Sequence, residues 1–167
     1  MQTEILKFWR NSELGFPFSY GEHPVFKDYS LDIATNTLCA LTGPSGCGKS
    51  TFFHLLLRFE KIGKGEIRIG GMQIDLYPKE QYSGLITCVL QQPYFFHMSV
   101  YENLALIDPD YERIRKGCKD AGIDEYIMSL PKQYDTILEE GAENFSGGQR
   151  QRLAIARALL KEAKILL

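Results

Sequence analysis

Residues 43–51, GPSGCGKST, combine glycines with a lysine and hydroxyl side chains. Their spacing fits the pattern G-x-x-x-x-G-K-S/T, in which glycines let the backbone approach an anion closely. The amides of such a loop and the N-terminus of a following helix attract negative charge. We expect Lys49 to bind β- and γ-phosphates and the Ser50 hydroxyl to bind Mg²⁺. The predicted phosphate contacts are Gly43, Ser45, Gly46, Cys47, Gly48, Lys49, Ser50 and Thr51.

This loop indicates binding of a nucleoside triphosphate but does not identify the reaction, because kinases, GTPases and motor ATPases share it. The alternative is a glycine-rich turn without a function. Average residue usage makes a full match in a chain of this length roughly a one-in-a-hundred accident. A predicted buried strand at residues 38–41 and a predicted helix at 49–60 flank the loop in the order that the motif requires.

A second segment, FSGGQRQR at residues 145–152, places a serine and two glycines at the start of a predicted helix. A serine hydroxyl, unobstructed glycine amides and the positive end of a helix dipole together suit a phosphate. Ser146 is also a suitable helix N-cap, since serine is common at that position. The tetrapeptide alone leaves both interpretations open.

Together the two segments resemble those of the ABC ATPases, a family whose diagnostic motif is LSGGQ. The resemblance implies ATP and Mg²⁺ as cofactors, with ATP hydrolysis coupled to transport across a membrane. It also implies a head-to-tail dimer, in which the second motif of one domain contacts the ATP held by the other. Phe145 replaces the usual leucine, and we expect a modest effect. The residues expected to act in trans are Ser146, Gly147, Gly148 and Gln149.

A glutamine and a tyrosine gain predicted roles from the same resemblance. LITCVLQQPYFF resembles the family's Q-loop region and places its glutamine at Gln91, whose carbonyl oxygen can reach Mg²⁺ or the attacking water. Gln91 and Lys49 are therefore the expected catalytic residues. Tyr20 matches the aromatic residue that stacks on adenine. Without the family, Gln91 is an exposed residue at a strand end and Tyr20 an aromatic residue packed on a sheet.

Within the family, the runs MSLPKQYDT and TILEEGAENFSGGQRQR resemble those of exporters. Gln133 stands where exporters often have glycine, and we expect a modest effect. The implied partners are a second nucleotide-binding domain and a transmembrane transporter domain, which the acidic residues 139–141 would face at the cytoplasmic side of a membrane. A non-transport ABC ATPase for DNA repair is disfavoured, because residues 91–146 are too few for a long coiled coil.

In the family, the strand after the signature helix ends in an aspartate that holds Mg²⁺, followed by a catalytic glutamate and later a switch histidine. This chain ends at residues 165–167, and His23, His54 and His97 all precede the signature. We therefore expect the chain as given to be a marginally stable, nearly inactive fragment, since losing a general base costs about 10²- to 10⁴-fold. The alternative to a working ATPase is a truncated, non-catalytic nucleotide-binding fragment.

The predicted fold class is α/β, a P-loop NTPase core with an N-terminal antiparallel β subdomain and an inserted α-helical subdomain. Residues 1–91 are expected to form the β subdomain and core, and residues 92–146 the helical subdomain. The signature helix and the start of the next strand are expected in residues 147–167. A further strand is predicted at 85–92 and helical structure over 99–130.

Composition fits one ordinary globular domain, with 44% hydrophobic and 24% charged residues among 167. A formal net charge of -2 argues against a nucleic-acid partner, which usually requires a strongly basic face. The 4 cysteines lack the C-x-x-C spacing of a zinc site. No apolar stretch approaches the roughly 18–20 residues of a membrane-spanning helix, so membrane crossing is expected of a partner.

Overall fold

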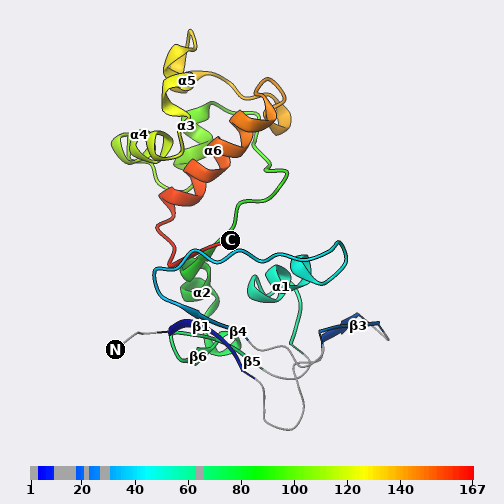
Figure 1. Cartoon of the computed structure of the whole chain (residues 1–167). Helices are drawn as coiled ribbons and strands as arrows, with labels where there is room; N and C mark the ends of the chain where they lie inside the picture. Colours follow the sequence, from blue (N-terminus) through cyan, green and yellow to red (C-terminus); the bar gives the residue numbers. More distant parts are fainter. Residues whose placement is uncertain (1–3, 10–17, 21–22, 27–30, 63–65) are drawn as a thin grey trace. The chain divides into compact units, whose positions relative to one another are not determined.

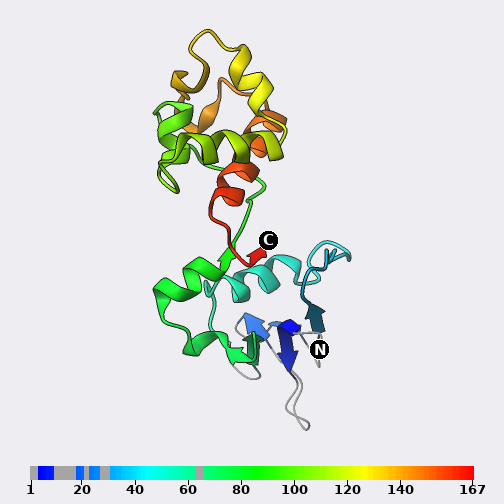
Figure 2. The same cartoon turned by 90° about the vertical axis from the view of Figure 1, so that its left-hand side faces the viewer.

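The computed structural model describes residues 4–9, 18–20, 23–26, 31–62 and 66–167, with side chains described from residue 31 onward. The chain forms two compact units, Met1–Tyr82 and Ser83–Leu167. Figures 1 and 2 show the elements of each unit in two orientations. The expected subdomain boundaries near residues 91 and 146 stay a prediction.

A four-stranded antiparallel sheet is the framework of the first unit, with strand order β4-β1-β5-β6. Strand β5 alternates as a half-buried strand should, because Ile67 and Ile69 are buried while Glu66 and Arg68 are partly exposed. A separate hairpin joins β2 to β3. The predicted antiparallel β subdomain is therefore confirmed. The strands are β1 (Glu4–Trp9), β2 (Phe18–Tyr20), β3 (His23–Phe26), β4 (Leu31–Ala34), β5 (Glu66–Ile69) and β6 (Met72–Gln73).

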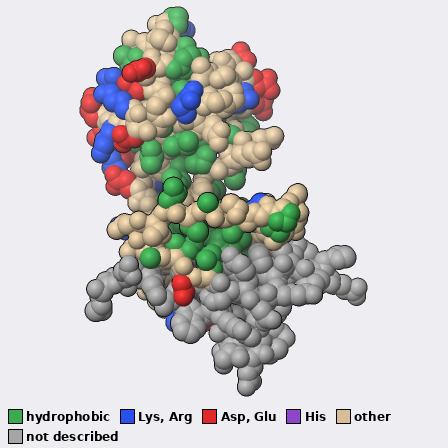
Figure 3. Space-filling view, in the orientation of Figure 1, with side chains coloured by type: hydrophobic (Ala, Val, Ile, Leu, Met, Phe, Trp, Pro, Cys, Tyr) green, Lys and Arg blue, Asp and Glu red, His purple; other side chains and the backbone are tan. Residues whose placement is uncertain are grey.

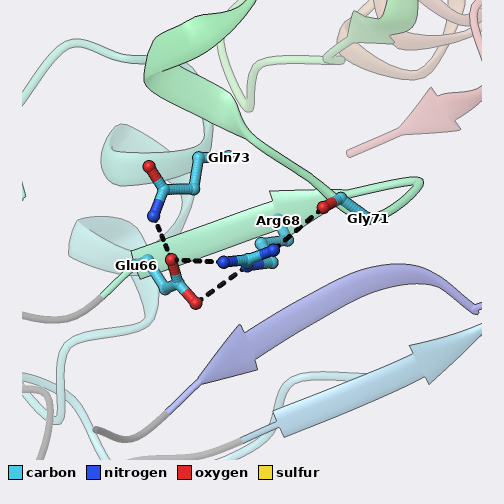
Figure 4. A network of polar contacts seen from close by, with 4 residues as sticks. All are labelled: Glu66, Arg68, Gly71 and Gln73. Carbon is cyan, nitrogen blue, oxygen red and sulfur yellow. Dashed lines mark hydrogen bonds and ion pairs between the residues drawn. The ribbon is translucent and has the colours of Figure 1, made fainter.

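Polar contacts secure the hairpin between β5 and β6 (Figure 4). Arg68 donates two hydrogen bonds to the Glu66 carboxylate, at 2.8 Å and 3.0 Å, and a third to the Gly71 carbonyl at 3.1 Å. The Gln73 amide donates to the same carboxylate. The hydrogen bond from Arg68 lowers the pKa of Glu66. Gly70 and Gly71 both have positive φ, as the two central residues of a tight hairpin require.

Helix α1 (Lys49–Leu56) begins where the sequence predicts but ends earlier than residue 60. The reason is Arg58, which has a φ of 57° and so leaves the right-handed helix. Its guanidinium group lies 3.7 Å from the centre of the Tyr82 ring and donates to the Tyr77 carbonyl at 3.2 Å. The Tyr82 hydroxyl in turn donates to the Leu56 carbonyl at 2.5 Å. These contacts attach the end of α1 to η1 (Ile74–Leu76) and α2 (Lys79–Leu85).

Two strand predictions differ from the structure. Residues 38–41 form no strand, and Leu38 is fully exposed. The physical reason is pairing, since within the described part of the chain no strand hydrogen-bonds to this segment and an extended run needs a ladder to become a strand. The predicted strand at 85–92 is shortened to β7 (Ile86–Thr87), which pairs in parallel with β8 (Ile165–Leu166).

The second unit is a helical lobe around a single apolar core, as predicted for the region after residue 99. Side chains that are fully buried in it include Phe95, Leu104, Ile114 and Leu153. Acidic and basic side chains are interspersed over the face of this lobe that is drawn in Figure 3. The elements are α3 (Val100–Ala105), α4 (Tyr111–Asp120), α5 (Asp124–Ser129), η2 (Gln133–Asp135), η3 (Glu140–Ala142) and α6 (Gly147–Leu160).

No helix within the described residues is both long and apolar enough to span a membrane.

A buried carboxylate joins three of these elements. Asp124, at the start of α5, accepts a hydrogen bond from the Tyr134 hydroxyl at 2.7 Å and two from Arg115 of α4, at 3.2 Å and 3.3 Å. Burial opposes ionisation, but the hydrogen bonds from Arg115 and Tyr134 outweigh it and lower the pKa of Asp124.

Gln133, which precedes Tyr134, has a φ of 45°, and this explains why glycine suits the position.

Helices α4 and α6 pack closely where α4 has a glycine. A Cβ atom added at Gly117 would lie 3.4 Å from the Ala156 carbonyl oxygen and 3.4 Å from Leu160. Leu153, Ala156 and Leu160 form the buried face of α6. The close crossing therefore sets the position of the helix that follows the second motif.

We predict that Gly117→Leu lowers the free energy of unfolding of this chain, because the added side chain has no space between α4 and α6. Overpacking costs about 1–3 kcal/mol, and the better helix propensity of leucine offsets about 0.8 kcal/mol of it. Urea unfolding followed by circular dichroism measures the change. Lys116→Leu is the matched control, since Lys116 is exposed on the same helix. Equal stability of the two variants would contradict the close crossing.

Candidate functional site

Glycines shape the loop at residues 43–51, and the structure shows why each is needed. A Cβ atom at Gly43 would lie 2.7 Å from the Cys47 sulfur, closer than such atoms approach. Gly46 and Gly48 have φ values of 79° and 96°, in the region that favours glycine. The loop therefore curls back on itself in a way that side chains at these three positions would prevent.

The Lys49 ammonium group lies against this loop. Its Nζ donates to the carbonyl oxygen of Gly43 at 2.8 Å and to that of Pro44 at 2.7 Å, and it lies 3.7 Å from the Cys47 sulfur. The structure thus brings together the lysine and the glycines that the sequence predicts to act together. An ammonium group with mobile donors can exchange carbonyl oxygens for phosphate oxygens.

The backbone amides of the loop are available to an anion. The Cys47 amide donates to the Pro44 carbonyl at 3.4 Å, whereas the amides of Ser45, Gly46 and Gly48 have no backbone acceptor within the described residues. Gly48 is the N-cap of α1 and offers no side-chain cap, and the first turn of α1 contains no acidic residue. Open amides, a helix N-terminus and a nearby cation are the arrangement that binds phosphate.

The two hydroxyl residues after Lys49 differ in exposure. Ser50 is exposed, and its predicted contact with Mg²⁺ stays a prediction. Thr51 is buried, and its predicted phosphate contact would come from its amide. Among the described residues, no group of three or more His, Cys, Asp and Glu side chains could hold a metal ion.

Gln91 and Tyr20 stay predicted site residues. Gln91 follows β7 in the second unit and is exposed, which agrees with its description as a polar residue at a strand end. Its predicted contact with Mg²⁺ stays a prediction. Tyr20 lies in β2, but its side chain is outside the described part of the chain, so adenine stacking also stays a prediction.

Ser146 caps helix α6, as the second interpretation of the SGGQ motif proposes. Its Oγ accepts a hydrogen bond from the Gln149 amide at 3.3 Å, and its own amide donates to Gln149 Oε1 at 2.8 Å. This reciprocal pair is a capping box. Capping uses the hydroxyl as an acceptor, so its proton stays available for donation to a ligand. The cap and the predicted phosphate contact are therefore compatible.

The glycines of the SGGQ motif meet open space. A Cβ atom at Gly147 would have no heavy atom within 4 Å, and one at Gly148 would come no closer than 3.8 Å to Arg152. Neither glycine has a positive φ. Because alanine is the better helix former, nothing within the described packing explains glycine at these positions.

Two polar residues that support the site were not predicted from the sequence. Asn103 is fully buried; its Oδ1 accepts from the Phe96 amide at 2.8 Å, and its Nδ2 donates to the carbonyls of Phe96 and Ser99 at 3.0 Å. Arg150 donates to the carbonyls of Phe145 and Ala142, just before the SGGQ motif. The sequence signal for Asn103 is a polar residue on the apolar face of SVYENLAL. Arg150 has no such local signal.

Phe145, the departure from the usual leucine, is buried in the core of the helical lobe. Its ring meets the Tyr126 ring edge to face, with centroids 5.3 Å apart. An aromatic residue therefore fits this position, and the packing agrees with the modest effect expected of the substitution.

A family model described as ABC transporter matches residues 26–167. Among curated relatives, the chain is 38% identical over 154 residues to the lactococcin-G-processing and transport ATP-binding protein LagD of Lactococcus lactis subsp. lactis, covering 90% of the chain and 22% of the relative. It is 44% identical over 146 residues to the mycobactin import ATP-binding/permease protein IrtA of Mycolicibacterium smegmatis, covering 86% and 17% respectively.

The solved structure of a bacterial Atm1-family ABC exporter with ATP bound is also similar to this chain. The TM-score is 0.86 with 30% identity, and the match covers 99% of this chain and 29% of that one. The chain thus spans about a fifth of the length of the curated relatives named above. These similar proteins include an import protein and an exporter, so they share the ATP-binding domain but differ in the direction of transport.

We predict that Ser146→Ala and Ser146→Asp have different effects on the stability of this chain. Alanine removes the N-cap and should lower the free energy of unfolding by about 0.5–2 kcal/mol, whereas aspartate is itself a good cap and should change it little. Urea unfolding followed by circular dichroism measures both. If the Ser146→Ala variant is as stable as the wild type, the capping box does not stabilise α6 and the prediction is wrong.

Proposed function

We propose, from the premise that this chain belongs to the ABC transporter family, that it drives transport by binding and hydrolysing ATP at the loop of residues 43–51. The chain is an ATP-binding domain of an exporter-type transporter, and domains of this kind are ATPases. The observation that carries the proposal is the Lys49 ammonium group against a loop whose curl requires glycines. The amides of Ser45, Gly46 and Gly48 in this loop have no backbone acceptor within the described residues.

The residues of the loop divide the work of holding the triphosphate. Lys49 exchanges the Gly43 and Pro44 carbonyls for β- and γ-phosphate oxygens, while the open amides and the N-terminus of α1 donate to the same anion. The exposed Ser50 hydroxyl holds Mg²⁺, which when bound neutralises charge on the phosphates. Gln91 acts at the same ion or at the attacking water.

The SGGQ motif serves the ATP of a second nucleotide-binding domain. Ser146 keeps a free hydroxyl proton while it caps α6, and Gly147 and Gly148 leave open space in front of the helix N-terminus. An approaching γ-phosphate accounts for both features, because it needs donors and close access. The two domains then close head to tail only while the γ-phosphate is present, and hydrolysis reopens them.

A surface of the helical lobe suits a transmembrane partner at the cytoplasmic face of a membrane. Tyr94 and Phe96 are exposed and pack edge to face, with ring centroids 5.4 Å apart. The acidic segment 139–141 adjoins them, since the Gly141 amide donates to the Phe95 carbonyl at 3.1 Å. Exposed aromatic residues beside a charged rim are typical of an interface.

We predict that Lys49→Ala weakens binding of MgATP to this chain. A lost hydrogen bond to a charged group is worth about 1.5–3 kcal/mol, which corresponds to roughly 10- to 100-fold in Kd. Isothermal titration calorimetry measures the affinity. Lys61→Ala is the matched control, because Lys61 is an exposed lysine of the same unit outside the loop. An unchanged Kd in the Lys49 variant would refute the proposed site.

In the complete transporter we predict that Ser146→Asp leaves ATP binding intact but lowers ATPase activity by about 10²-fold or more, the loss typical of removing a transition-state donor. Aspartate keeps the helix cap but places a carboxylate where the γ-phosphate would approach. Gln151→Glu, at an exposed position of the same helix, is the control for added charge. Full ATPase activity in the Ser146 variant, measured by phosphate release, would rule out the role in trans.

A further inference from the structure

Arg157 of helix α6 contacts the segment that follows Gln91. Its Nη1 donates to the Tyr94 carbonyl at 2.9 Å, and the centre of its guanidinium group lies 4.6 Å from the centre of the Phe95 ring. Among the described residues this is the side chain of α6 that hydrogen-bonds to the run 93–98. Arg157 therefore hydrogen-bonds the signature helix to the residues that come directly after Gln91.

The surroundings of Arg157 are unfavourable for a cation. The side chain is half-buried, and no carboxylate within the described residues forms an ion pair with it. Burial lowers the pKa of its guanidinium group. A partly buried charge without an ionic partner is costly unless its hydrogen bonds and ring contact compensate. Stability alone would be served as well by an apolar residue of similar volume.

The hydrogen bond from Arg157 meets the segment after Gln91 at Tyr94. A cavity of about 170 Å³ separates the earlier part of the segment from α6, and its lining includes Cys88, Leu90, Pro93, Ile107, Arg157 and Lys161. Leu90 and Gln91 are exposed. Before the cavity, the Val89 amide donates to the Leu167 carbonyl at 2.8 Å and Lys161 Nζ donates to the Ile86 carbonyl at 3.3 Å. Leu90 and Gln91 therefore lie between those contacts and the contact of Arg157 with Tyr94.

Beyond Arg157 the segment is fixed to the rest of the lobe as well. Phe95 is fully buried, and its carbonyl accepts from the Gly141 amide at 3.1 Å. Asn103 holds the backbone at Phe96 and Ser99, and Ser99 forms an antiparallel bridge with Ile137. The residues after Tyr94 thus belong to the same packed body as the SGGQ helix, with Arg157 at its boundary.

We propose that Arg157 is a positioning residue that transmits displacement of the Gln91 segment to helix α6, and so sets the position of Ser146. The inference rests on the proposed function, because the position of Ser146 matters to turnover only if Ser146 meets a nucleotide. A guanidinium group is suited to the task, since its plane stacks on Phe95 while an edge N–H reaches the Tyr94 carbonyl. A lysine can make one of these contacts at a time.

The test uses the complete transporter with Arg157→Met and Arg157→Lys. We expect Kd for ATP to stay within about twofold of the wild type, because the phosphate-binding loop belongs to the other compact unit. The kcat for ATP hydrolysis should fall about tenfold in the methionine variant at unchanged KM, with partial recovery in the lysine variant. Lys116→Met, an exposed cation of α4, is the control for loss of charge.

A second measurement on this chain keeps the inference independent of catalysis. Hydrogen–deuterium exchange of the Arg157→Met variant should be faster at the amides of Phe96 and Gly141, whose bonds depend on the fixed segment. The amides in the core of α4 should be unchanged.

Unaltered exchange at these two amides would overturn the inference, and so would a methionine variant with wild-type kcat. A lower melting temperature with unchanged kcat per folded molecule would show a purely structural role and overturn it too. A wild-type transporter without ATPase activity would instead refute the proposed function, and the exchange experiment would still decide the role of Arg157.

Discussion

The Lys49 ammonium group is held by two carbonyl oxygens of the loop that precedes it, at 2.8 Å and 2.7 Å, and the geometry of the nucleotide site depends on this contact. The loop can curl around the ammonium group only because Gly43 leaves room for Cys47 and because Gly48 turns the chain into α1. A cation, open amides and a helix N-terminus then converge on one small volume. Carbonyl oxygens hold a cation less strongly than phosphates do, so the lysine can change partners when an anion arrives.

The position of this loop depends in turn on how α1 is anchored at its other end. Arg58 leaves the helix with a positive φ, stacks on Tyr82 and bonds to the Tyr77 carbonyl. Tyr82 donates back to the last turn of α1, and its burial raises its pKa to about 12. The strain at Arg58 is thus offset by contacts that fix helix α1, whose N-terminus follows the proposed phosphate-binding loop.

The SGGQ motif follows a different principle, because its residues satisfy one another and still leave capacity for a ligand. Ser146 and Gln149 accept hydrogen bonds from each other's backbone amides at the start of α6. The serine hydroxyl proton and the open space beside Gly147 and Gly148 remain available to a ligand. Gly117 allows α4 to fix the helix from one side, and Arg157 joins it to the segment after Gln91. The local geometry of the motif is complete within this chain, whereas its proposed ligand comes from a partner.

Local sequence signals predicted the start of α1 and the helices after residue 99, because periodicity and glycine spacing are properties of neighbouring residues. They failed at residues 38–41, where a strand depends on pairing that a hydrophobic run does not guarantee. They also placed the end of α1 too late, because the conformation of Arg58 is set by its tertiary contacts and not by its helix propensity. Arg157 could not be identified in advance, since its partners Tyr94 and Phe95 are about sixty residues away.

The central claim is that the loop of residues 43–51 binds the β- and γ-phosphates of ATP. It is tested most directly by titrating this chain with MgATP and with AMP in parallel, because AMP presents the same base and sugar without those phosphates. The account predicts that ATP binds at least about 100-fold more tightly, since AMP lacks several charge-assisted hydrogen bonds. Equal affinity for the two nucleotides would contradict it.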